Sequence, residues 1–144
     1  MTDTELQPMA PFQGIGHFIS GYYFKPHLLA DRPIASVLTR NEGEELVFAF
    51  VDGSTATFTA QGDCCSRSWV EHLTVPSDIA GAVVTHVAEN EMGETWNDPD
   101  HYECVRVYQT TFRTAKGDIV VEYRNESNGY YGGWLEGPVI AVPA

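Results

Sequence analysis

The chain has 144 residues, of which 43% are hydrophobic, so it is long enough to bury one core and too short for two comfortable domains. Twenty acidic residues against eight basic ones give a formal charge of −12, which argues against direct binding of DNA or RNA through their phosphates. The sequence has no apolar run of about eighteen residues and no secretion signal, which predicts a soluble, cytoplasmic protein without a membrane partner.

The N-terminal part of the chain is the least regular. Residues 1–14 are polar and contain prolines, which predicts a tail in front of a single β-rich domain at 15–144. Between residues 14 and 29, glycines and Pro26 interrupt a series of aromatic residues. We expect this stretch to be an irregular segment that packs its rings against the core.

The clearest local signal is a β-hairpin. Two β-prone runs, 45–51 and 54–60, flank Asp52-Gly53, a pair that suits a two-residue type I′ turn. A weaker strand pattern at 33–40 precedes this hairpin. Together the three strands form a meander.

The second half of the chain repeats this order. A strand is expected at 82–89, then an acidic loop, a long strand at 102–114, a turn at 116–118 and a returning strand at 119–125. The two halves align with Trp69 on Trp134, which suggests an internal duplication covering 33–73 and 82–136.

The fold class that follows is mainly β, with antiparallel sheets built from two three-stranded meanders. Each meander would end in a Gly/Ser-rich corner whose tryptophan, Trp69 or Trp134, is buried in a shared core. In that case replacing Trp69 by alanine would cost about 3–5 kcal/mol. One or two short helices are expected, at 66–73, where a serine can cap the N-terminus, and at 76–81.

The three cysteines give little indication of a metal site. Zinc ligands usually come in pairs separated by about two to four residues, whereas Cys64 and Cys65 are adjacent and Cys104 stands alone. We expect no cofactor and interpret the cysteines as small buried hydrophobes. A thiol or metal-dependent enzyme built on Cys64, Cys65 and His72 remains an alternative.

The two corners of the meanders carry the residues best suited to bind a ligand. Arginine holds a phosphate or carboxylate, aromatic rings stack on a base or sugar, and neighbouring glycines let the backbone approach closely. The candidate ligand-binding residues are Arg67, Trp69, Arg124, Asn128, Tyr130 and Tyr131. No catalytic residue is assigned.

Two motifs in these corners also carry a resemblance. "GDCCSRSWVEHL" at 62–73 and "IVVEYRNESNGYYGGWL" at 119–135 resemble a small protein family that is found largely in phage genomes and in some bacteria. This family is known as a domain of unknown function. The resemblance covers roughly residues 33–136. It implies a compact β-rich domain of phage origin, and it carries no activity and no assigned site residues.

These observations lead to three hypotheses about function. The first is a non-enzymatic, phage-type binding protein, active in counter-defence in the host cytoplasm, that recognises a small anionic, nucleotide-like ligand through the Arg/aromatic corners. The second is an acidic inhibitor that docks on a host protein through an acidic face with Glu89, Glu91 and Glu94, or through an exposed aromatic patch. The third is the thiol or metal-dependent enzyme. The sequence leaves homo-oligomerisation open.

Overall fold

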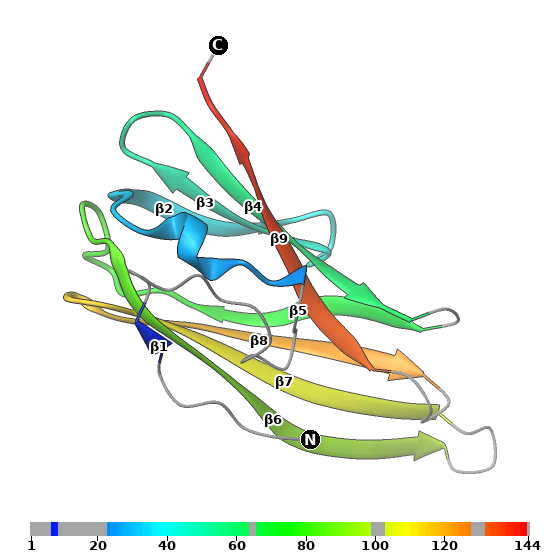
Figure 1. Cartoon of the computed structure of the whole chain (residues 1–144). Coiled ribbons are helices and arrows are strands. Elements are labelled where there is room, and N and C mark those ends of the chain that lie inside the picture. Colours follow the sequence, from blue (N-terminus) through cyan, green and yellow to red (C-terminus); the bar gives the residue numbers. More distant parts are fainter. Residues whose placement is uncertain (1–6, 9–22, 64–65, 99–102, 128–131, 144) are drawn as a thin grey trace.

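The computed structural model of the chain is a two-layer β-sandwich (Figure 1), and it describes residues 7–8, 23–63, 66–98, 103–127 and 132–143. The five-stranded sheet contains, in spatial order, β1 (Gln7–Pro8), β6 (Val84–Asp98), β7 (Glu103–Thr114), β8 (Gly117–Ser127) and β5 (Arg67–Thr74). The four-stranded sheet contains β2 (Ile34–Arg40), β3 (Glu45–Phe50), β4 (Thr55–Gly62) and β9 (Gly133–Ala141). All the ladders are antiparallel.

The predicted mainly β fold with two three-stranded meanders is confirmed. Strands β2-β3-β4 form the first meander and β6-β7-β8 the second. After each meander the chain crosses to the opposite sheet, so that β5 pairs with β8 and β9 pairs with β4. Each sheet therefore contains a strand from the other half of the chain, while the internal duplication itself stays a hypothesis.

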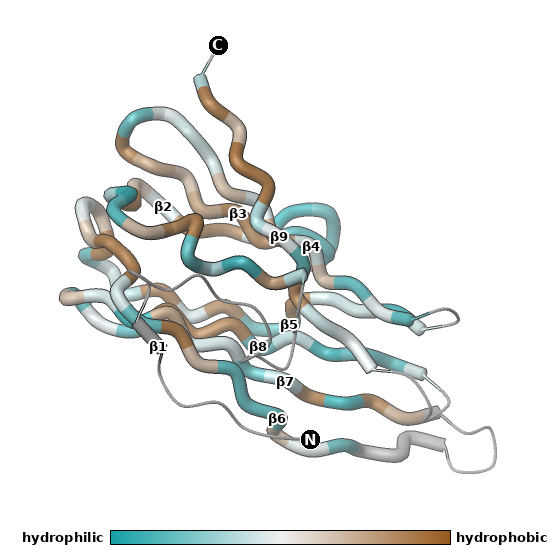
Figure 2. Tube along the Cα trace, viewed as in Figure 1, coloured by the Kyte–Doolittle hydropathy of each residue, from teal (hydrophilic) through white to brown (hydrophobic). Residues whose placement is uncertain are grey.

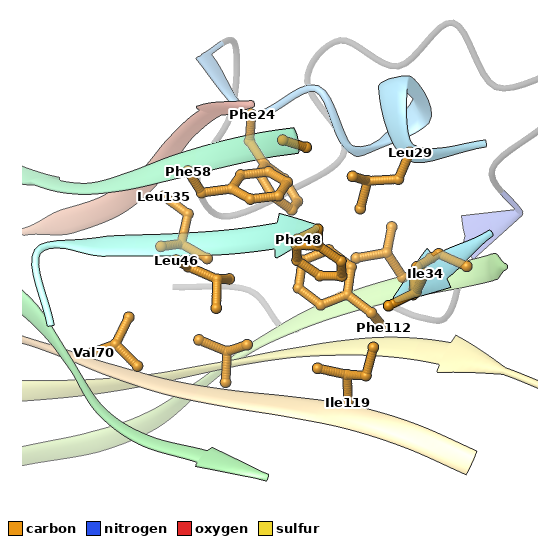
Figure 3. Close-up of a cluster of buried hydrophobic side chains, with 14 of the residues drawn as sticks. Phe24, Leu29, Ile34, Leu46, Phe48, Phe58, Val70, Phe112, Ile119 and Leu135 are labelled. Atoms are coloured by element: carbon orange, nitrogen blue, oxygen red, sulfur yellow. The ribbon is translucent and has the colours of Figure 1, made fainter. Parts of the chain in front are cut away.

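The core between the two sheets is built around four phenylalanine rings (Figure 3). Phe48 and Phe58 come from the four-stranded sheet, Phe112 from the five-stranded sheet, and Phe24 from the segment that precedes the 3₁₀ helix η2 (Pro26–Leu29). The centroid of Phe112 lies 5.1 Å from that of Phe48 and 5.8 Å from that of Phe58. Burying a phenylalanine side chain stabilises a fold by about 1.5–3 kcal/mol, so this cluster ties the two layers together.

The hairpin predicted around Asp52-Gly53 is present, but its turn is not type I′. The backbone N–H of Gly53 donates to the carbonyl of Phe50, and only Gly53 has a positive φ in this turn, +88°. Asp52 instead accepts hydrogen bonds from the N–H and hydroxyl of Ser54. The loop is therefore one residue longer than predicted, with glycine alone in the left-handed conformation.

The helix predicted at 66–73 is wrong, because this stretch forms β5. A β-bulge between Val70 and His72 resets the strand alternation, so that Val70 and Leu73 both face the core. Apolar residues three positions apart imitate helical spacing, which explains the incorrect prediction. No α-helix occurs among the described residues; Pro26–Leu29 forms the 3₁₀ turn η2, and 76–81 forms turns.

The acidic loop predicted after residue 89 is also wrong, because β6 continues to Asp98. Three register shifts divide its ladder with β7. These irregularities turn acidic side chains of β6 toward the interior, and Glu89 is 1% exposed. A strand whose polar residues face inward does not show the alternation that marks an ordinary amphipathic strand.

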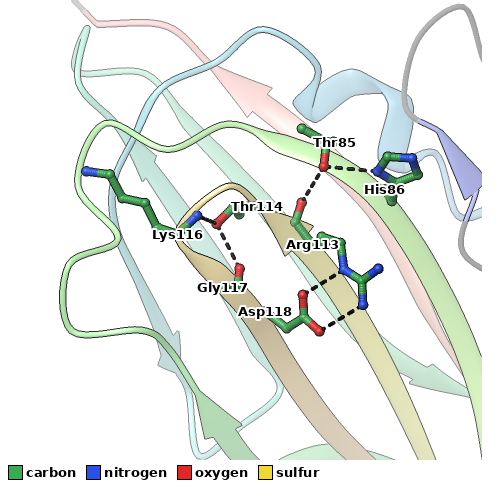
Figure 4. A network of polar contacts seen from close by, with 7 residues as sticks. All are labelled: Thr85, His86, Arg113, Thr114, Lys116, Gly117 and Asp118. Atoms are coloured by element: carbon green, nitrogen blue, oxygen red, sulfur yellow. Dashed lines mark hydrogen bonds and ion pairs between the residues drawn. The ribbon is translucent and has the colours of Figure 1, made fainter.

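A polar network closes the β7–β8 hairpin at one end of the sandwich (Figure 4). Arg113 donates from Nε and Nη2 to the two carboxylate oxygens of Asp118, at 3.1 and 3.4 Å. The Thr114 hydroxyl donates to the carbonyl of Gly117 and accepts from the N–H of Lys116. These groups fix the turn that sets the β7–β8 register, and they lie at the end opposite to the predicted corners.

Candidate ligand-binding surface

The two corners singled out in the sequence meet at one end of the sandwich. Gly62, at the end of β4, lies opposite Gly133 at the start of β9, and Arg67, at the start of β5, lies opposite Glu126 near the end of β8. Residues far apart in the chain are thus brought together by the crossing of β5 and β9 between the sheets.

Asn125 joins the corners on the inner side. Its side chain is fully buried, and its Nδ2 donates to the hydroxyls of Ser66 at 3.1 Å and Ser68 at 3.0 Å. Its Oδ1 is buried and has no hydrogen-bond partner among the described residues. Asn125 therefore holds the β4–β5 corner against β8.

Gly133 permits the close approach of these strands. A Cβ atom at this position would lie 2.5 Å from the Ser68 hydroxyl and 2.9 Å from the Cβ of Asn125. These distances are shorter than side chains tolerate, so the corner packs as it does only because residue 133 lacks a side chain.

On the outer side, three predicted residues form what we call the Arg–Trp surface: Arg67, Trp69 and Arg124. Trp69 lies directly opposite Arg124 in the β5–β8 ladder. The guanidinium carbon of Arg67 lies 5.1 Å from the centroid of the Trp69 ring, a cation–π distance. Since Val70 and Tyr123 face the core, the neighbouring Trp69 and Arg124 face outward.

Acidic residues balance the charge of the Arg–Trp surface. Glu122 accepts a hydrogen bond from Nη2 of Arg124 at 3.1 Å, and its carboxylate lies 3.6 Å from Nε2 of His72. The indole N–H of Trp69 donates to Glu71 at 2.6 Å. The Nε of Arg124 is buried and has no acceptor among the described residues, so one donor of this guanidinium is uncommitted there.

A second polar cluster lies on the inner face of the same sheet. The rings of Tyr108 and Tyr123 stack at 5.0 Å, and the Tyr123 hydroxyl donates to Glu89 at 3.1 Å. The N–H of Gly133 donates to the Tyr108 hydroxyl at 3.3 Å. Burial raises the pKa of Tyr108 above its ordinary value, against the opposing effect of the Gly133 N–H.

Cys104 belongs to this inner cluster, where its surroundings disfavour a thiolate. Its side chain is fully buried, and its thiol lies 3.7 Å from the carboxylate of Glu94, which also pairs with Arg106 at 3.2 Å. Burial raises the pKa of the Cys104 thiol, and the Glu94 charge raises it further. A raised pKa disfavours the thiolate that a nucleophile needs.

The remaining predicted site residues are not described by the structure. Asn128, Tyr130 and Tyr131 lie outside the described residues, as do Cys64 and Cys65. The described residues that flank the first three, Ser127 and Gly132, belong to the end of the sandwich where the corners meet.

The prediction that Trp69 and Trp134 are buried in a shared core is wrong. Both are only partly buried, and they lie on the outer faces of different sheets. Trp134 stacks on the exposed ring of Tyr23 with centroids 6.4 Å apart. The physical reason is strand alternation, since each tryptophan precedes a residue that occupies the core, Val70 or Leu135.

Sequence reasoning missed Glu122 and did not assign Asn125 to the site, although Asn125 belongs to the polar corner. The alternation of β8 carries a signal for Glu122, because it stands two residues from Arg124 and so shares its face. Asn125 carries no such signal, because its partners Ser66 and Ser68 belong to a distant strand.

Within the described ranges, no group of three or more His, Cys, Asp or Glu side chains is arranged to hold a metal ion. No helix in the same part of the chain is long and apolar enough to cross a membrane.

Comparison with known proteins identifies the family of the chain. Residues 26–135 match the sequence model of a family described as a domain of unknown function, DUF7448. The chain belongs to this family. The match confirms the resemblance to an uncharacterised domain family and includes both motif-bearing corners up to Leu135. No curated protein matches the chain, and neither does any solved structure.

Proposed function

We propose that this DUF7448 protein is a non-enzymatic binding protein that recognises a small anionic, nucleotide-like ligand on the Arg–Trp surface. The observation that supports this proposal best is the direct juxtaposition of Trp69 and Arg124, with Arg67 above the indole. A flat ring and two guanidinium groups on one sheet face match the parts of a nucleotide, an aromatic base and a phosphate.

The existing contacts of this surface are weak enough for a ligand to replace. An exposed cation–π contact such as that of Arg67 on Trp69 contributes about 0.5–1 kcal/mol. A surface ion pair such as Arg124–Glu122 contributes about 0–1 kcal/mol. A base would stack on Trp69, and a phosphate would take the place of Glu122 at Arg124.

The uncommitted Nε of Arg124 adds support to this arrangement. Guanidinium groups bind phosphate best through two parallel N–H donors, and only Nη2 of Arg124 is engaged by Glu122. A phosphate that displaces Glu122 and reaches the buried Nε would satisfy both donors at once.

The biological setting belongs to the same proposal. We place the protein in phage counter-defence, where it would sequester a nucleotide signal of the host cytoplasm. Support for this setting comes from the resemblance of the two motifs to a protein family found largely in phage genomes, and from the small size of the chain.

The acidic inhibitor hypothesis receives less support from the geometry. Glu89 is 1% exposed and accepts a hydrogen bond from Tyr123, and Glu94 pairs with Arg106. The buried Glu89 is not accessible to a docking partner, and Glu94, whose side chain is 44% exposed, is already paired. For the thiol enzyme, His72 pairs with Glu122 on the outer face, and Cys64 and Cys65 lie outside the described residues.

A thermal-shift screen with cyclic and linear nucleotides tests the proposal. We expect at least one nucleotide to raise the melting temperature of the wild-type protein and to lose this effect in Arg124→Gln. Arg113→Gln is the matched control, because Arg113 is also paired with an acidic residue, Asp118, at the opposite end of the same sheet. No stabilisation by any nucleotide, or equal stabilisation of Arg124→Gln, would refute the proposed site.

A further inference from the structure

The outer face of the four-stranded sheet carries two rows of small or apolar side chains, with one residue from each strand in each row. The first row is Leu38, Val47, Thr57 and Val139. The second row is Ser36, Ala49, Thr55 and Ala141. None of these residues is charged, and we call the eight together the uncharged face.

Apolar side chains of this face are in contact with water. Leu38, on the edge strand β2, is 41% exposed, and Val139, on the edge strand β9, is 71% exposed. The end of β9 is brown in Figure 2, which marks it as hydrophobic. Val47, which lies between Leu38 and Val139 in the same row, is 4% exposed, so the exposed apolar surface is at the two edges of this face. Exposed apolar side chains mark candidate interaction sites on soluble proteins.

The next row carries charges that are arranged with opposite signs at opposite edges. It consists of Arg40 on β2, Glu45 on β3, Thr59 on β4 and Glu136 on β9. The positive charge of Arg40 is at one edge of the sheet and the negative charge of Glu136 is at the other. Arg40 lies 3.6 Å from Glu45, and its side chain is 53% exposed, so it remains available to another partner.

We propose that the uncharged face is the interface of a homodimer whose two-fold axis runs parallel to the strands. This rotation reverses the order of the strands and keeps each row opposite the same row. Leu38 then meets Val139 of the second copy, and Arg40 meets Glu136 of the second copy, each pair occurring twice.

Sheets that pack face to face are rotated by about 30° and lie about 10 Å apart, and the long side chains of Arg40 and Glu136 can span the resulting offset. A two-fold axis perpendicular to the strands would reverse the order of the rows and keep each strand opposite itself. The charged rows of the two copies would then lie apart, so Arg40 would not meet Glu136 of the second copy. The arrangement of charges therefore selects the parallel axis.

The net charge of the chain restricts where a second copy can bind. Each copy carries a formal charge of −12, so two copies repel each other over most of their surfaces. The uncharged face places no like charges in direct contact, and the Arg40–Glu136 pairs add attraction across it. The Arg–Trp surface lies on the other sheet and stays open in such a dimer.

Sedimentation velocity over a range of micromolar concentrations tests the interface. We expect the wild-type protein to form a concentration-dependent dimer, and Val139→Lys to raise its dissociation constant at least about tenfold. The matched control is Met92→Lys, which replaces a 55% exposed side chain on β6 of the other sheet and should leave the dimer intact. A monomeric wild-type protein, or a dimer that Val139→Lys does not weaken, would overturn the proposal.

A charge swap tests the orientation of the two copies. Arg40→Glu and Glu136→Arg should each weaken the dimer, because each places like charges opposite each other. The double variant should recover the affinity, since every pair is again of opposite sign. Circular dichroism of each variant confirms that the fold is retained. Failure of the double variant to recover, with the fold intact, would rule out the proposed axis.

Discussion

Trp69 lies directly opposite Arg124 across the β5–β8 ladder, and the guanidinium of Arg67 covers its ring. This relationship brings together the two corners that appear far apart in the sequence. It exists because β5, which follows the first meander, crosses to pair with the last strand of the second. The crossing thus produces the surface for which we propose ligand binding.

Replacing Trp69 by alanine should destabilise the protein by only about 1–2 kcal/mol, because the indole is partly exposed and its main contacts are Arg67 and Glu71. Urea denaturation monitored by circular dichroism measures this change in the free energy of unfolding. A loss of about 3–5 kcal/mol would instead indicate a tryptophan buried in the core.

Replacing Phe112 by alanine should cost about 3–5 kcal/mol, because this ring is fully buried between Phe48 and Phe58 of the opposite sheet. The same denaturation experiment measures the loss, and Phe112→Leu, which leaves a smaller cavity, serves as the comparison. Equal and small losses in both variants would contradict the assigned packing of the core.

Replacing Asn125 by alanine should cost about 2–3 kcal/mol, because two hydrogen bonds are lost and the buried Ser68 hydroxyl loses its partner. Ser77→Ala, in an exposed turn outside both proposed surfaces, should change the unfolding free energy by less than about 0.5 kcal/mol. If the two variants have equal stability, Asn125 does not hold the corners together.

Local patterns in the sequence predict much of the fold. Thr55, Thr57 and Thr59 alternate with core residues, and this alternation correctly identifies the second arm of the hairpin. In β5, by contrast, a bulge places Val70 and Leu73 on one face with helical spacing, so the pattern predicts the wrong element. Bulges depend on the partner strand, and a local pattern does not contain that information.

The candidate site could be predicted only in part. Arg67, Trp69 and Arg124 are found from residue types that suit anion and ring binding, and they do lie together. The extent to which these side chains are buried and the sheet in which they lie could not be predicted, because both depend on the crossing of β5 between the sheets. The contact of Asn125 with Ser68 is likewise a long-range consequence of that crossing.

The raised pKa of Tyr108 predicts a loss of stability at alkaline pH. Because burial keeps the phenol protonated in the folded state, its contribution is fully present below the unfolded pKa of 10.0 and is lost as the pH rises above it. The free energy of unfolding should therefore fall less steeply above pH 10 in Tyr108→Phe than in the wild type. Parallel pH profiles, measured by urea denaturation, would contradict this assignment.

The central claim, that Trp69 and Arg124 receive an anionic ligand, is tested most directly by nuclear magnetic resonance. The indole N–H signals of Trp69 and Trp134 report on the outer faces of different sheets, and Trp69→Phe assigns the relevant signal. On titration with the cyclic and linear nucleotides, we predict that the Trp69 and Arg124 side-chain N–H signals shift together in a saturable way, while that of Trp134, on the opposite sheet, stays in place. Saturable shifts elsewhere that leave Trp69 and Arg124 unchanged, or no shift with any nucleotide, would contradict the claim.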